Sequence, residues 1–170
     1  MPMRRHKEVQ QYLEDVLDRL EDNGFSCEQN VSFAGKTFWW VAHRAHYLGV
    51  RQGYRELFVH FAGFGDLNED VFTDFCAASF EHGCKNKRCS FPVGMYLQIW
   101  CFPVALVDRL DDDMVDFVRN HQPAKHWNSC EMPCAYEAET DELHYYQRTP
   151  VWGALYYPMR RSLIQTLLAP

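Results

Sequence analysis

The sequence predicts an α/β or α+β fold, in which helices pack on a mixed sheet within one compact domain that spans residues 1–170. Amphipathic segments with helical spacing alternate along the whole chain with runs rich in β-branched and aromatic residues. The 170 residues are 47% hydrophobic and 15% aromatic, which is enough to build one buried core. No repeat, low-complexity tract or linker-like stretch divides the chain.

The N-terminal third predicts a helix followed by a hairpin. Apolar residues recur at intervals of three and four across residues 4–23, and Asn23-Gly24 then ends the helix. Residues 25–33 and 36–41 are rich in strand-forming residues and are separated by an Ala-Gly turn, so we expect two paired strands. Residues 43–54 contain signals for both a loop and a helical turn, and their structure is left open.

The middle of the chain predicts a central strand, a helix and a second long strand. Residues 56–62 form a nearly continuous apolar run, typical of a strand covered on both faces and central in its sheet. Residues 66–82 begin with helix-capping residues and continue with helical spacing, and a basic loop follows at residues 84–89. Residues 94–107 predict another buried strand that frays or bulges at Pro103.

The C-terminal third predicts a helix, a second hairpin and a final helix. Three consecutive aspartates at 111–113 lie in the first turn of a helix over residues 110–119, where negative charge favours the helix dipole. This capping role outweighs a metal-binding one. Residues 134–138 and 143–147 flank a polar turn, and an amphipathic helix begins near Pro158.

The order of elements across residues 4–107 resembles the core of restriction-endonuclease-like proteins. That family places a carboxylate on the second strand and an acid-x-Lys pair on the third, where they hold divalent metal and orient water for phosphodiester attack. Here residues 36–41 contain no acid, and residues 58–61 contain neither the acid nor the lysine. The resemblance therefore implies a similar fold that lacks the nuclease site, and no catalytic residue is carried over.

The cysteines carry the most specific chemical signal in the chain. Four of the seven form two close pairs, Cys84 with Cys89 and Cys130 with Cys134, and two such pairs can supply four thiolate ligands to zinc or to an iron–sulfur cluster. Neither spacing is the common C-x2-C. The alternative is that the cysteines are small buried hydrophobes or chance members of a solvated loop, and this alternative is favoured.

Other candidate sites are weaker. His43 and His46 would share a face only on a helix, and ordinary hydrogen-bonded histidines are favoured over metal ligands. A cysteine nucleophile beside a histidine base is chemically open to a chain with seven cysteines and eight histidines, but no local signature selects a pair. The segment 63–65 lacks the third glycine and the lysine of a phosphate-binding loop.

Charge and composition restrict the setting. The net charge of −6 disfavours a grip on a phosphate backbone. No apolar run has the length of a signal peptide or a membrane span, so we expect a cytoplasmic protein with no membrane association. The odd number of cysteines agrees with a reducing compartment.

Aromatic residues favour an interaction surface. Adjacent pairs such as Trp39-Trp40 and Tyr156-Tyr157 must place at least one ring away from any single core face. For Trp39-Trp40 a core on both faces of the sheet is favoured, whereas for Tyr145-Tyr146 on the second hairpin an interface gains weight. We therefore expect a non-catalytic protein that works through association with itself or with another protein, using aromatic surface near its C-terminal third. A homodimer through the 134–147 hairpin or the final helix is one form of this hypothesis.

Two alternatives stay open beside that hypothesis. One is a metal-dependent or thiol-dependent enzyme, or a metal-stabilised module, that uses Cys84, Cys89, Cys130 and Cys134. The other is an inactive nuclease-like module that touches nucleic acid. Its basic residues would be Arg4, Arg5, Lys7 and the loop at 85–88.

Overall fold

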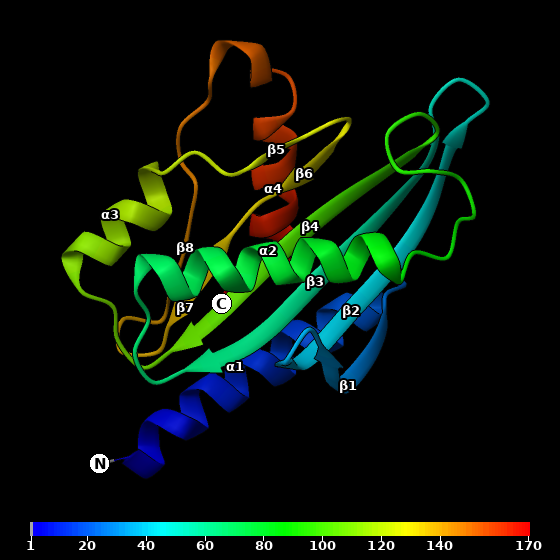
Figure 1. The fold of residues 1–170 in the computed structure, drawn as a ribbon. Coiled ribbons are helices and arrows are strands. Elements are labelled where there is room, and N and C mark those ends of the chain that lie inside the picture. Colours follow the sequence, from blue (N-terminus) through cyan, green and yellow to red (C-terminus); the bar gives the residue numbers. More distant parts are fainter. Residues whose placement is uncertain (1) are drawn as a thin grey trace.

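The computed structural model describes residues 2–170, with side chains described from residue 7 onward. Within these residues eight strands form one mixed sheet, and four α-helices pack on it (Figure 1). The predicted fold class is therefore confirmed, and the fold is α+β. In chain order the elements are α1 (Pro2–Asp22), β1 (Ser26–Phe33), β2 (Lys36–Gly49), β3 (Gly53–Phe64), α2 (Glu69–Lys85), β4 (Leu97–Val107), α3 (Asp112–Asn120), β5 (Lys125–His126), β6 (Ser129–Glu131), β7 (Cys134–Glu137), β8 (Glu142–Tyr145), the 3-10 turn η1 (Val151–Gly153) and α4 (Tyr157–Leu167).

The sheet is parallel in its centre and antiparallel towards both ends. β1, β2 and β3 pair in antiparallel order, whereas β3 and β4 are parallel and are joined through α2. β6 and β7 both pair with β4 in parallel, β6 near its middle and β7 along its last residues. β5 and β8 then pair with β6 and β7. β3 therefore has a neighbour on each side, as its apolar run predicted.

Pro103 does not interrupt β4. The register between β3 and β4 is continuous from Tyr54 paired with Leu97 to the last residue of each strand. Met132 donates its main-chain N–H to the carbonyl of Cys101, so the main-chain groups of residue 103, two positions on, also point away from β3. On that side β6 ends at Glu131 and β7 begins at Cys134. Because no strand pairs with Pro103 there, the main-chain N–H that proline lacks is not needed for the sheet.

The segment at 43–54, whose structure the sequence left open, extends two strands. β2 runs to Gly49 and β3 begins at Gly53. Gly53 has a φ of +69°, and a Cβ at this position would collide with the main chain of Tyr96. The glycine therefore allows the end of the hairpin to contact the segment that precedes β4.

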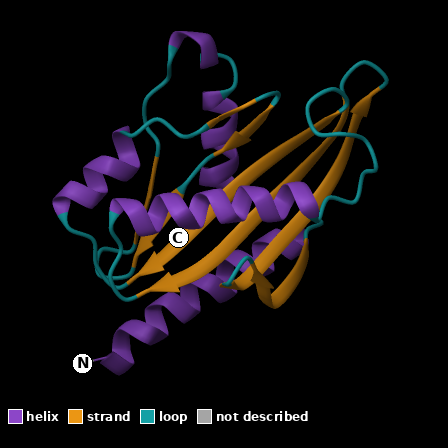
Figure 2. Ribbon diagram, in the orientation of Figure 1, coloured by secondary structure: helices purple, strands orange, loops and turns teal. Residues whose placement is uncertain are grey.

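Helices cover both faces of the sheet (Figure 2). α1 and α4 pack on one face with a core layer that includes Val16, Trp100 and Ile164. α2 and α3 pack on the other face with a layer that includes Phe75 and Met114. The sheet thus separates two apolar layers, and this separation decides which chemical groups can meet. No helix within residues 2–170 is long and apolar enough to cross a bilayer.

Candidate binding site

The four cysteines predicted as metal ligands lie on opposite faces of the sheet. Cys84 and Cys89 pack at the margin of the α2 layer, whereas Cys130 and Cys134 are buried in the α1 layer. Since the sheet lies between the two pairs, their thiols do not converge. Among the described residues no group of three or more His, Cys, Asp or Glu side chains could hold a metal ion, so the structure does not support the zinc site that was one of the alternatives for these cysteines.

Burial also raises the pKa of three of these thiols, those of Cys84, Cys130 and Cys134. All seven cysteines are free. Burial raises the pKa of Cys130 to about 12 and outweighs the opposite effect of Arg160 and Arg55. Burial, followed by the negative charge of Glu131, raises the pKa of Cys84. The thiolate is the reactive form of cysteine, and neither environment favours it.

Glu56 explains the shape of the basic loop at 84–89. This fully buried carboxylate accepts hydrogen bonds from two main-chain N–H groups of the loop, at 2.9 and 2.6 Å, and from Nε2 of His43 at 2.6 Å. Burial raises the pKa of Glu56, but these hydrogen bonds outweigh it and lower the pKa below its usual value. Glu56, the only acid of β3, therefore has a structural role. His43 and His46 lie on opposite faces of β2, so they do not share a face as metal ligands would.

A buried thiol and two histidines form a chain on the α2 face of the sheet. Sγ of Cys101 lies 3.5 Å from Nδ1 of His60, whose Nε2 lies 2.9 Å from Nδ1 of His82. Burial, assisted by His82, lowers the pKa of His60, and burial raises the pKa of Cys101. Both shifts favour the neutral groups, and the tautomer of each ring sets which group donates in the two hydrogen bonds. This is not an activated thiolate–imidazolium pair.

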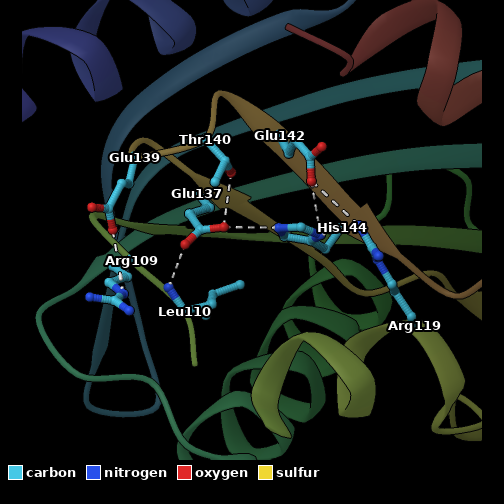
Figure 3. A network of polar contacts seen from close by, with 8 residues as sticks. All are labelled: Arg109, Leu110, Arg119, Glu137, Glu139, Thr140, Glu142 and His144. Atoms are coloured by element: carbon cyan, nitrogen blue, oxygen red, sulfur yellow. Dashed lines mark hydrogen bonds and ion pairs between the residues drawn. The ribbon is translucent and has the colours of Figure 1, made fainter. Parts of the chain in front are cut away.

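A second buried Glu–His pair lies where β7 and β8 meet the start of α3 (Figure 3). Glu137 accepts hydrogen bonds from the main-chain N–H of Leu110 at 2.9 Å, the hydroxyl of Thr140 at 2.9 Å and Nε2 of His144 at 3.2 Å. Arg119 donates to Nδ1 of His144 at 3.0 Å. Burial raises the pKa of Glu137, but the hydrogen bonds lower it below its usual value. The network ties α3 to the β7–β8 hairpin and leaves no oxygen of the glutamate unused.

A basic and aromatic cleft of about 280 Å³ opens between β4, the β5–β6 hairpin and α4. Cζ of Arg55 lies 3.7 Å from a ring centroid of Trp100, and Cζ of Arg160 lies 5.2 Å from it. Nζ of Lys125 lies 4.7 Å from a ring centroid of Trp152. We define the tryptophan–arginine cleft by five lining residues, Trp100, Lys125, Trp152, Tyr156 and Arg160, together with Arg55, which does not line the cavity itself but lies against the ring of Trp100.

The two arginines of this cleft have no ion pair with a described carboxylate. Arg55 donates to the side-chain oxygen of Gln98 at 3.2 Å. Burial lowers the pKa of Arg55, and the positive charge of Arg160 contributes to the lowering. Nε of Arg160 is the one buried side-chain nitrogen or oxygen in the described part of the chain that lacks a hydrogen-bond partner. Glu131 also lines the cleft, but its carboxylate is bonded to His126 at 3.0 Å. The cleft therefore favours an anionic group.

Large apolar side chains are exposed around this cleft. Figure 1 shows η1 and the start of α4 beside the β5–β6 hairpin. In contrast, Tyr146 of the predicted aromatic hairpin is only 3% exposed, so that ring does not contribute to an interface. The exposed large apolar residues of the C-terminal third are Trp127, Val151, Trp152, Leu155, Tyr156 and Met159.

Of the basic residues predicted to touch nucleic acid, Lys7 is exposed, whereas those of the 85–88 loop have local partners. Lys85 forms an ion pair with Glu81 at 2.6 Å, and Arg88 donates to the hydroxyl of Ser26 at 2.8 Å. The side chains of Arg4 and Arg5 are outside the described part of the chain.

No protein-family model, curated protein or solved structure matches this chain. The resemblance to restriction-endonuclease-like proteins rests on element order alone and stays a prediction. Sequence reasoning expected aromatic surface in the C-terminal third but missed Arg55, Trp100 and Arg160 as a cluster. No local signal could have found them, because they come from β3, β4 and α4 and meet only through the sheet order.

Proposed function

We propose that the protein is a non-catalytic binding module that holds an acidic segment of a partner protein in the tryptophan–arginine cleft. The observation that carries this proposal is the placement of Arg55 and Arg160 against Trp100 without a carboxylate partner among the described residues. Guanidinium groups bind carboxylates through paired hydrogen bonds, and a carboxylate of the partner would supply the missing counter-charge.

The rim of the cleft supports a protein partner. Tryptophan, tyrosine and arginine are the residue types that dominate the binding energy of protein interfaces, and all three are present here. The exposed fractions of Trp152 and Leu155 are 54% and 84%. Exposed apolar side chains that gather in one region indicate an interaction surface.

The remaining chemistry supports binding over catalysis. The thiols of Cys84, Cys101 and Cys130 have raised pKa values, and the carboxylates of Glu56 and Glu137 are held by structural hydrogen bonds. The seven free cysteines agree with a reducing compartment, and we propose the cytosol.

The test is fluorescence polarisation with a labelled 12-residue peptide of alternating glutamate and leucine, beside the same peptide with glutamine for glutamate. We expect the acidic peptide to bind and the glutamine peptide to bind at least tenfold more weakly. Arg160→Gln and Trp152→Ala should each weaken binding of the acidic peptide at least tenfold, as for interface residues that carry binding energy. Arg51→Gln, which changes an exposed arginine between β2 and β3, is the matched control.

Two results would replace this proposal. A labelled oligothymidylate that binds more tightly than the acidic peptide, and loses binding in Arg160→Gln, would make the cleft a nucleic-acid site. A dimer seen by sedimentation that dissociates in Trp152→Ala would make a second copy of the chain the occupant.

A further inference from the structure

We propose that the protein has a second binding site, a cavity of about 480 Å³ between α2 and α3, which takes a small apolar molecule carrying a protonated amine. This site does not depend on the proposed function of the tryptophan–arginine cleft, although His126 and Glu131 line both cavities. The volume lies within the usual range of small-molecule pockets.

The walls of the cavity are apolar, and their charges are negative. α2 contributes Phe72 and Phe80, and α3 contributes Phe117 and Val118. The lining residues, all of which belong to the described part of the chain, include no lysine or arginine and two glutamates, of which Glu81 is paired with Lys85 and Glu131 has no lysine or arginine partner. An apolar body is therefore accommodated by the walls, and a positive charge is favoured over a negative one.

Glu131 is the buried acid of this cavity, and it accepts fewer hydrogen bonds than the other buried glutamates of the protein. The protein buries three glutamates that each bond to a histidine: Glu56, Glu131 and Glu137. Glu56 and Glu137 each accept three hydrogen bonds. Glu131, which is 5% exposed, accepts one side-chain hydrogen bond, from Nε2 of His126 at 3.0 Å. Its second oxygen accepts from no donor among the described residues and is not fully buried, since Nε of Arg160 is the one fully buried side-chain nitrogen or oxygen there without a partner.

The surroundings hold this carboxylate in place at the cavity wall. The ring of His126 stacks on Phe80 with centroids 3.6 Å apart and an angle of 10° between the planes, which fixes the imidazole that bonds to Glu131. Tyr146 also lines the cavity, and its hydroxyl has no hydrogen-bond partner among the described residues. A buried carboxylate is costly unless donors or a cation surround it, and an ammonium group supplies both.

Isothermal titration calorimetry at pH 7 with 2-naphthylmethylamine and 2-naphthylmethanol tests this site. The two probes share their apolar body and differ in charge. We expect the amine to bind wild-type protein at least tenfold more tightly than the alcohol. Glu131→Gln should reduce that ratio to about twofold or less and leave the affinity for the alcohol within about twofold, because the substitution changes charge and keeps shape.

A second variant locates the binding and does not depend on folding around Glu131. Ala77 is exposed and lines the cavity on α2, so Ala77→Trp should reduce the affinity for the amine at least tenfold. Val71→Trp is the matched control, because Val71 is exposed on the same helix but does not line the cavity. Absence of amine binding to wild type, equal affinity for both probes, or full binding to Ala77→Trp would each overturn the proposal.

Discussion

Glu131 and Glu137 lie a few residues apart on consecutive strands, and both are 5% exposed and bonded to a histidine. Their surroundings differ. Glu137 also accepts hydrogen bonds from a main-chain N–H and a hydroxyl (Figure 3). Glu131 accepts only from its histidine and lies at a cavity wall. A buried Glu–His pair is thus not by itself a functional signal. The number of donors and the presence of adjacent space separate a structural carboxylate from one that can bind a ligand.

Removing the carboxylate of Glu137, which accepts three hydrogen bonds, should have the largest effect on stability. Glu137→Ala should lower the free energy of unfolding by about 3 kcal/mol, because the N–H of Leu110 and the ring of His144 lose their acceptor in a buried position. Urea denaturation followed by circular dichroism measures this change. Glu142→Ala on the same hairpin is the control, since its carboxylate is 57% exposed and its loss should cost less than about 1 kcal/mol. Equal losses would contradict the structural role of Glu137.

The His60–His82 pair contains no carboxylate, so its contribution to stability should change with pH in a higher range than that of Glu137. Burial, assisted by His82, lowers the pKa of His60 below 6.5, so below pH 6.5 the unfolded chain binds a proton that the native state does not. Stability should therefore fall as the pH decreases from 6.5, by about 1.4 kcal/mol per pH unit, until the native pKa is reached. Glu137, whose pKa is lowered, adds a separate loss below about pH 4.5.

The measurement is urea denaturation of wild type and His60→Gln at several pH values between 7 and 5. The variant should show a smaller slope of stability against pH over this range. Val59→Ala is a control at a side chain that is also buried on the same strand but faces the opposite core layer, and it should lower stability without changing the slope. A slope that is the same in wild type and His60→Gln would show that His60 does not titrate differently in the two states.

Local patterns account for the part of the fold that could be predicted. The apolar stripe of α1 and the three aspartates before α3 act within a few residues of each other, and Asp111 caps α3 by accepting the N–H of Met114 at 2.7 Å. The candidate sites depend on sheet order instead. The two cysteine pairs lie on opposite faces because α2 and the loop after it cover one face, whereas Cys130 and Cys134 project from β6 and β7 into the other layer. Arg55 and Arg160 share the ring of Trp100 only because α4 packs beside β4. Spacing along the chain carries no information on either point.

The strand pair β5–β6 was also missed, and it forms walls of both cavities. β5 has two residues and β6 has three, which is too short for a periodic pattern to identify. Its residues His126 and Glu131 line the tryptophan–arginine cleft and the cavity between α2 and α3.

Glu131→Gln should have the smallest effect on stability and gives the sharpest test of the comparison. The glutamine retains an acceptor for His126, and only one hydrogen bond to the original carboxylate is changed, so we expect the free energy of unfolding to change by less than about 1 kcal/mol. Relief of a poorly solvated charge acts in the opposite direction to the loss of the charged hydrogen bond, and the variant can therefore be slightly more stable than wild type. Urea denaturation at pH 7 beside Glu137→Gln, the same substitution at the saturated site, measures the difference. A loss at Glu131 as large as that at Glu137 would show that both carboxylates are structural, and it would remove the physical reason for expecting an amine in the cavity.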